Sequence, residues 1–312
     1  MIYRVKLKPI SPFLTPWQAD TIFGHLCWAL LRLEGEDALK KFLQPFSQNQ
    51  PPIIISDGFP QDLLPLPLTA NLLLPEPQKA EKRKILKKIK YIPINLFDQI
   101  RNAQTWCPSE DFQTPASFTQ IATPHASISR LTNTTAQGGK FFEQQEFIIQ
   151  APENNRFISI YLKIQPGWED KIKSLFQYIA HTGYGSKKSA GKGQVEFISM
   201  EKFEFSPINN PNGFISLSNF VPAPNDPTKG CYKILVKYGK LGEEFAQSGA
   251  PFKKPIIMLQ AGSCFKTQSP KEFYGSVLFN ISAKPQVIHY AYSFALPIIY
   301  PETRREEENA NA

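Results

Sequence analysis

The sequence has few of the residues that bind metals or form disulfides, with only 4 cysteines and 4 histidines among its 312 residues. The cysteines lie far apart and form no Cys-x-x-Cys pair, which argues against a zinc site and against a disulfide framework. They are Cys27, Cys107, Cys231 and Cys264. We therefore expect no cofactor and a reducing, cytoplasmic environment.

Long apolar runs are missing as well. No stretch approaches the roughly 20 apolar residues of a membrane-spanning helix. Residues 1–10 alternate Lys or Arg with apolar residues, unlike a secretory signal peptide. We expect a soluble, unsecreted protein that makes no contact with membranes.

The sequence does contain enough apolar residues for large cores, and it carries a surplus of positive charge. Hydrophobic residues make up 42%, and 312 residues exceed the usual size of one domain, so we expect two domains. Lys and Arg number 35 against 27 Asp and Glu, and the resulting net charge of +8 favours an anionic partner.

Hydrophobic periodicity predicts six main elements within residues 1–205, interrupted by a long insertion over roughly residues 60–155. They are a strand over 2–9, a helix over 19–33, a strand over 51–59, a strand over 157–164, a helix from residue 168 and a strand over 194–205. This sequence of elements is the ferredoxin-like order. Within the insertion, residues 125–131 and 141–149 flank a polar tip and predict a hairpin.

A second, smaller and β-rich domain is expected over residues 206–301. Residues 206–213 are rich in Pro, Asn and Gly, which favour turns and predict the domain boundary. Strand patterns follow over 214–221, 232–238, 256–265 and 276–281, whereas helical patterns are weak. The charged and small residues 302–312 predict a disordered tail.

The most informative segment is a loop over residues 183–193, which combines glycines, lysines and serines. Its members are Gly183, Tyr184, Gly185, Ser186, Lys187, Lys188, Ser189, Gly191, Lys192 and Gly193. Glycine lets a backbone approach a ligand closely, and lysine adds positive charge, so we expect a phosphate-rich partner. The spacing excludes a nucleotide-binding P-loop, because Lys192 precedes a glycine and the loop joins a helix to a strand.

Catalytic signals are weak. His25, His125, His181 and His289 show no partner in sequence, although an imidazole could serve RNA cleavage near neutral pH. A basic run over residues 79–90 fits either an RNA contact or a solvated face.

Four segments together resemble one known family. They are Ala19-Asp20-Thr21-Ile22-Phe23-Gly24, Lys88-Ile89-Lys90-Tyr91-Ile92-Pro93, His125-Ala126-Ser127-Ile128-Ser129-Arg130-Leu131-Thr132, and the glycine loop. In this order they resemble the RAMP superfamily of CRISPR proteins, specifically the subunits that cap the 5′ handle of the guide RNA in type III-A (Csm) effector complexes. The second domain resembles that family only loosely, through Gly262-Ser263-Cys264-Phe265 and His289-Tyr290-Ala291-Tyr292.

The resemblance implies an α+β fold of tandem ferredoxin-like (RRM-like) domains with a thumb hairpin, without a catalytic centre, in a cytoplasmic ribonucleoprotein for antiviral defence. It implies that the glycine loop contacts the 5′ handle of the guide RNA (crRNA), and that the hairpin contacts the guide-target duplex. The other RNA-binding residues implied are Asp20, Thr21 and His25 at the first helix and Arg130, Lys140, Phe141 and Phe142 at the hairpin. The protein partners implied are the large polymerase-like (cyclase) subunit and the adjacent backbone RAMP subunit.

Two other functions remain open at this stage. One is a RAMP endoribonuclease that processes precursor crRNA, with His25 or His181 as acid or base. The other is a protein-interaction scaffold that does not contact RNA.

Overall fold

The first strand, β1 (Ile2–Pro9), is an inner strand of a four-stranded sheet. Its apolar side chains alternate with charged ones, so one face of the strand is buried. Val5 and Leu7 are fully buried in the computed structural model, whereas Lys6 between them is only half-buried. The sheet is antiparallel throughout, in the order β2-β7-β1-β8. Its other strands are β2 (Ile53–Pro60), β7 (Ile158–Ile164) and β8 (Val195–Lys202). The structure describes residues 1–75, 79–135, 141–247 and 249–302.

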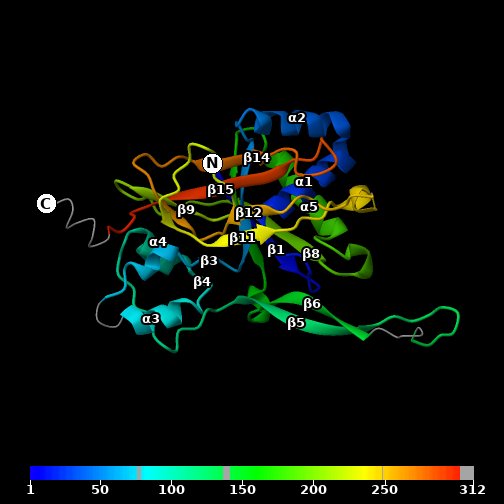
Figure 1. Cartoon of the computed structure of the whole chain (residues 1–312), viewed down its shortest axis with the longest axis horizontal. Coiled ribbons are helices and arrows are strands. Elements are labelled where there is room, and N and C mark those ends of the chain that lie inside the picture. The colour runs from blue at the N-terminus through cyan, green and yellow to red at the C-terminus, as the bar shows by residue number, and fades with distance from the viewer. Residues whose placement is uncertain (76–78, 136–140, 248, 303–312) are drawn as a thin grey trace.

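Helices α1 (Ala19–Glu34) and α5 (Glu169–Thr182) pack against each other beside this sheet (Figure 1). Their buried apolar residues recur at helical spacing, as Ile22, Phe23 and Leu26 do in α1. Gly35, with φ of 85°, separates α1 from α2 (Glu36–Ser47), which inserts Phe42 and Phe46 into the core.

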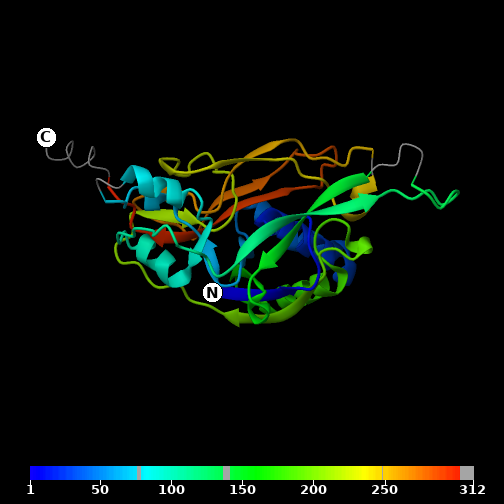
Figure 2. The same cartoon turned by 90° about the horizontal axis from the view of Figure 1, so that it is seen from below.

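The segment between β2 and β7 contains short elements and one long hairpin. The short elements are β3 (Leu63–Pro65), η1 (Leu68–Asn71), α3 (Lys79–Leu86), β4 (Tyr91–Pro93), α4 (Ile94–Arg101) and η2 (Glu153–Asn155). The hairpin strands β5 (Ser117–Ala126) and β6 (Phe141–Gln150) pair antiparallel along their full length. The hairpin extends away from the rest of the molecule (Figures 1 and 2).

The remainder of the chain is β-rich. A five-stranded sheet has the order β10-β13-β9-β15-β14, and β11 pairs with β12 beside it. The strands are β9 (Gly213–Ser216), β10 (Gly230–Cys231), β11 (Ile234–Lys237), β12 (Ile256–Leu259), β13 (Cys264–Lys266), β14 (Phe273–Leu278) and β15 (His289–Ile298). Between 203 and 302 the described residues include one short 3-10 helix, η4 (Glu243–Gln247), and no α-helix.

The two parts of the chain share one hydrophobic core. Buried residues from β1, α1 and β7 belong to the same cluster as Tyr290, Tyr292 and Leu296 of β15. The Tyr290 hydroxyl accepts a hydrogen bond from the Ile55 amide at 2.8 Å, and the Tyr292 hydroxyl donates to the Phe46 carbonyl at 3.2 Å. Residues 203–212 carry no strand or helix, but the buried residues before and after this segment form one core, and the two-domain division stays a prediction.

All six elements predicted for residues 1–205 are confirmed in type and order. Several other predictions were wrong in detail. The first hairpin strand spans 117–126 and not 125–131, and the single strand expected over 256–265 is divided into β12 and β13 by a turn at Gly262 with φ of 91°. Helix α2 and the long strand β15 were not predicted. Of the expected tail, residues 303–312 lie outside the described residues.

None of the helices in the described part of the chain combines the length and the apolar character that a bilayer span requires.

Candidate nucleic-acid interface

The glycine loop begins where α5 ends, at Gly183, whose amide donates to the Ile179 carbonyl at 2.8 Å. Five of its residues have positive φ, and Lys187 is the only one of them that is not glycine. A short 3-10 helix, η3 (Lys188–Ala190), forms the middle of the loop. A Cβ on Gly193 would lie 1.9 Å from the Tyr184 carbonyl oxygen, so glycine is required there by sterics as well as by φ.

Tyr184 anchors the loop inside the protein and does not face a ligand. Its side chain is fully buried and stacks on Trp17 with ring centroids 3.6 Å apart. Its hydroxyl donates to the Pro16 carbonyl at 2.8 Å, and its amide donates to the Gly193 carbonyl at 2.8 Å. The sequence-based assignment of Tyr184 to RNA contact is therefore wrong for the side chain, because a buried ring cannot stack on a base.

His25 of α1 connects the loop to the first helix through a hydrogen bond. The Gly185 amide donates to His25 Nε2 at 3.0 Å, and the next amide, of Ser186, donates to Thr15 Oγ1 at 3.1 Å. Burial, assisted by the charge of Lys188, lowers the pKa of His25 to about 4. His25 is thus a neutral acceptor at neutral pH, and its Nε2 lone pair is already engaged by the protein.

Each lysine of the loop reaches a polar partner within the chain. Lys192 binds Glu146 of β6 at 2.7 Å, Lys188 binds Glu243 of η4 at 2.6 Å, and Lys187 donates to the Gln144 side chain. Glu146 is 1% exposed. Burial would raise its pKa, but the hydrogen bond and charge of Lys192 outweigh burial and hold the pKa below its ordinary value.

The exposed top of the loop has the features of an anion site. The backbone amides of Lys187, Lys188 and Ser189 donate to no acceptor among the described residues. Ser186, Lys187 and Ser189 are exposed, and among the described residues Lys187 donates to the neutral amide of Gln144 and pairs with no carboxylate. Successive free amides around a residue with positive φ are an arrangement that binds anions.

Asp20 and Thr21 do not line the same surface as the loop top. Asp20 is 6% exposed, and its carboxylate binds Lys237 of β11 at 2.5 Å, while Lys237 also donates to Thr21 Oγ1 at 3.3 Å. His289 of β15 lies 3.7 Å from the same carboxylate. Burial would raise the pKa of Asp20, but Lys237 and His289 together lower it. The buried carboxylate of Asp20 therefore argues against its predicted RNA contact, whereas Thr21 is half-buried and its RNA contact stays a prediction.

The hairpin residues divide into two groups. Phe142 is 45% exposed and stacks on His125 with ring centroids 5.4 Å apart. The centroid of its ring lies 5.7 Å from Lys187 Nζ, so Phe142 is next to the glycine loop. Phe141 is 78% exposed and Arg130 is also exposed, further along the hairpin. Lys140 lies outside the described residues.

Sequence reasoning missed the acceptors on β6. Gln144 and Glu146 alternate on one face of the strand, and both are buried beneath the loop lysines. This alternation of polar residues in the hairpin was a visible signal, since buried polar residues must find partners.

Comparisons with known proteins show what this chain is similar to. No family model matches the chain. A curated protein of Thermococcus onnurineus (strain NA1), the CRISPR system Cms protein Csm4, is 24% identical over 96% of this chain and 97% of its own length. The fold matches a chain in the crystal structure of a Csm1-Csm4 cassette with AMPPNP, with a TM-score of 0.65, 20% identity, and 96% and 99% coverage of the two chains. A Csm3-Csm4 subcomplex of a type III-A CRISPR-Cas interference complex matches with a TM-score of 0.61 and 17% identity over the same shares of the chains.

The chain is thus similar in sequence, over nearly its full length, to a Csm4 protein, and its fold is that of chains in Csm1-Csm4 and Csm3-Csm4 complexes. The resemblance drawn from the four sequence segments is thereby confirmed as a resemblance.

Proposed function

We propose that this chain is a non-catalytic RNA-binding subunit of a type III-A effector complex that binds and caps the 5′ handle of crRNA. In this function it bridges the large polymerase-like subunit and the adjacent backbone RAMP subunit. The names of the structural relatives support both partners, since one is a Csm1-Csm4 cassette and another a Csm3-Csm4 subcomplex.

The finer fold assignment supports RNA binding and is proposed with it. The first sheet runs β2-β7-β1-β8, with α1 after β1 and α5 after β7, as a ferredoxin-like domain requires. We assign the β5–β6 hairpin as the thumb. A ferredoxin-like origin for the second half rests on the resemblance alone, because its described residues contain no α-helix.

The observation that carries the proposal is the exposed top of the glycine loop. The loop of eleven residues is fixed on its inner side by Tyr184 and His25. Its exposed side carries three consecutive free amides, the Ser186 and Ser189 hydroxyls and the Lys187 ammonium. Rigid, outward-facing donors fit RNA phosphates, which accept hydrogen bonds independently of base sequence. Phe142 lies next to them and offers a face on which a splayed base can stack.

The state of His25 and His289 supports a function in which these two histidines are not catalytic. An acid-base histidine needs a pKa near the working pH and a nitrogen free for the substrate. His25 has neither, because its pKa is about 4 and its Nε2 accepts the Gly185 amide. His289 is buried, and burial lowers its pKa to about 4.

The loop assignment is tested by placing a negative charge beside the free amides. Ser189→Asp in the full-length chain should weaken binding of a labelled 5′ fragment of the guide RNA about tenfold, because one repelled phosphate contact costs about 1.4 kcal/mol. Ser174→Asp, on the exposed side of α5, makes the same change in charge away from the loop and serves as the control. Equal affinity of the two variants would refute the loop as the RNA site.

The endoribonuclease alternative is tested with labelled repeat RNA in the presence of a chelator. We expect no cleavage by the purified chain. Metal-independent cleavage that disappears in His25→Ala would overturn the non-catalytic assignment.

A further inference from the structure

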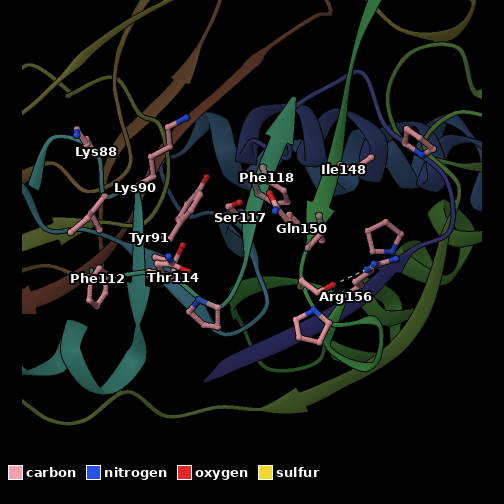
Figure 3. Close-up of a pocket in the computed structure, with 18 of the residues that line it drawn as sticks. Lys88, Lys90, Tyr91, Phe112, Thr114, Ser117, Phe118, Ile148, Gln150 and Arg156 are labelled. Atoms are coloured by element: carbon pink, nitrogen blue, oxygen red, sulfur yellow. Dashed lines mark hydrogen bonds between the residues drawn. The ribbon is translucent and has the colours of Figure 1, made fainter. Parts of the chain in front are cut away.

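An open groove of about 960 Å³ lies at the base of the hairpin, and no residue of the glycine loop lines it (Figure 3). Four chain segments that are distant in sequence form its walls. They are residues 9–12 after β1, residues 85–91 leading into β4, residues 110–118 leading into β5, and residues 148–156 after β6. A volume of this size accepts a ligand much larger than a single ion.

The charged side chains of the groove are mostly positive. Lys88, Lys90 and Arg156 line it, against the single carboxylate of Glu110. Lys88 and Lys90 are exposed and form no ion pair with any carboxylate in the part of the chain that the structure describes. Arg156 donates through Nε to the Ala151 carbonyl at 2.9 Å, which fixes its side chain at the rim and leaves its terminal nitrogens available. The groove therefore offers three cations to a ligand.

Aromatic rings lie among these cations. Tyr91, Phe112 and Phe118 are half-buried and line the groove, and the rings of Tyr91 and Phe118 meet edge to face with centroids 6.0 Å apart. Figure 3 shows Tyr91 beside Lys90, and Ser117 and Gln150 nearby as polar groups. Basic side chains interleaved with aromatic faces are what single-stranded RNA requires, because phosphates bind the former and unstacked bases the latter.

The wall that carries the lysines is held in place by the fold. The Lys90 carbonyl accepts the Leu66 amide at 3.1 Å, and the following residues pair with β3 in an antiparallel ladder. A fixed backbone beside exposed lysines reduces the ordering cost of binding, since only the side chains must become ordered.

The groove and the glycine loop share two segments. In residues 9–12, the Pro12 carbonyl accepts the Gly193 amide at 2.8 Å, and the Ile10 amide donates to the Gln194 carbonyl at 2.8 Å. In β6, Gln144 and Glu146 bind loop lysines, while residues 148–150 line the groove. One RNA strand bound at the loop could therefore continue along β6 into the groove.

We infer that this groove is a second RNA subsite, which binds a short single-stranded segment of the same guide RNA that the glycine loop holds. The inference rests on the proposed function for the identity of the RNA. Lys88, Lys90 and Arg156 bind phosphates, and the rings of Tyr91 and Phe118 support bases.

The test measures binding of the full-length chain to labelled 5′ fragments of the guide RNA of increasing length. The groove variant carries Lys88→Ala, Lys90→Ala and Arg156→Ala. The matched control carries Lys82→Ala, Lys84→Ala and Lys87→Ala. These substitutions also remove three positive charges, but they lie in the basic run over residues 79–90 at positions that do not line the groove.

We expect wild type and control to gain affinity once a fragment is long enough to enter the groove, and the groove variant to lack this gain. For long fragments, the plot of log binding constant against log salt concentration should be less steep for the groove variant by about 2. Three phosphate contacts to a single strand are lost, and each contributes about 0.7 to the slope. Equal losses in the groove variant and the control would overturn the subsite and indicate a nonspecific charge effect.

The outcomes also separate this inference from the proposed function. If Ser189→Asp weakens binding and the groove variant does not, the loop assignment stands and the groove is refuted as an RNA site. If neither variant matters, both are refuted. If RNA binding is intact but the groove variant no longer co-purifies with the neighbouring subunits, the groove holds an acidic protein segment, and the inference is overturned.

Discussion

The lysines of the glycine loop and those of the groove differ in what they bind within the protein. Lys188 and Lys192 each pair with a carboxylate, and Lys187 is bonded to a neutral amide. Lys88 and Lys90 have no carboxylate partner among the described residues. A lysine that already neutralises a glutamate offers less net charge to a phosphate than an unpaired one.

This difference separates two ways of binding an RNA backbone. The loop is a rigid structure whose lysines mainly fix its position, and its free amides and hydroxyls remain for the ligand. The groove offers exposed cations with few internal contacts. We therefore expect substitutions of the paired loop lysines, Lys188 and Lys192, to affect stability more than salt dependence, and substitutions of the groove lysines to do the reverse.

The largest effect is expected from Gly193→Ala. The new methyl group would lie 1.9 Å from the Tyr184 carbonyl oxygen at a residue whose φ is 69°, so the loop cannot keep its path. We expect a loss of about 3 kcal/mol in the free energy of unfolding, measured by denaturant titration. Gly191→Ala is the control, because its φ is 78° but nothing lies within 4 Å, and it should lose about 1 kcal/mol. Equal losses would show that the loop is not tightly packed.

The next effect concerns the buried carboxylate beneath the loop. Lys192→Ala leaves Glu146, which is 1% exposed, without its cation. We expect a loss of about 2 kcal/mol, since an unpaired buried charge is costly. Adding Glu146→Gln should restore most of it, and Lys187→Ala alone should cost less than about 0.5 kcal/mol. If the double variant is no more stable than Lys192→Ala, the ion pair does not hold the loop.

The pH dependence should report the contact between His25 and the Gly185 amide. The pKa of His25 is lowered from 6.5 to about 4, so between these values the unfolded chain binds more protons and stability falls as the pH falls. His25→Gln removes this proton uptake. The slope of the unfolding free energy between pH 5 and 6 should then decrease by about 1.4 kcal/mol per pH unit. The comparison cancels the contributions of His289 and of Asp57, a β2 residue whose pKa burial raises to about 7, because both are present in both chains. An unchanged slope would mean that His25 titrates normally.

These contacts also mark how far the sequence can predict the molecule. Alternation in β1 and helical spacing in α1 are local patterns, and both elements were predicted from them. The position of the glycine loop between helix and strand was predicted for the same reason. The partners were not, because the ion pair between Asp20 and Lys237 joins residues 217 positions apart and has no local signal. Tyr184 was misassigned because a tyrosine among glycines and lysines gives no sign that its ring is buried against Trp17.

The smallest expected effect is on the salt dependence of guide-RNA binding, measured for single lysine substitutions in the loop and in the groove. Lys187→Ala should reduce the log–log salt slope for guide-RNA binding by about 0.7, because this lysine has a neutral partner and is free to contact one phosphate. Lys188→Ala should reduce the slope less, since its charge is already balanced by Glu243 at 2.6 Å. Lys90→Ala should match Lys187→Ala for long fragments and have no effect for short ones. If Lys187→Ala and Lys188→Ala reduce the slope equally, internal pairing does not limit what a lysine offers to RNA, and the loop and the groove bind phosphates in the same way.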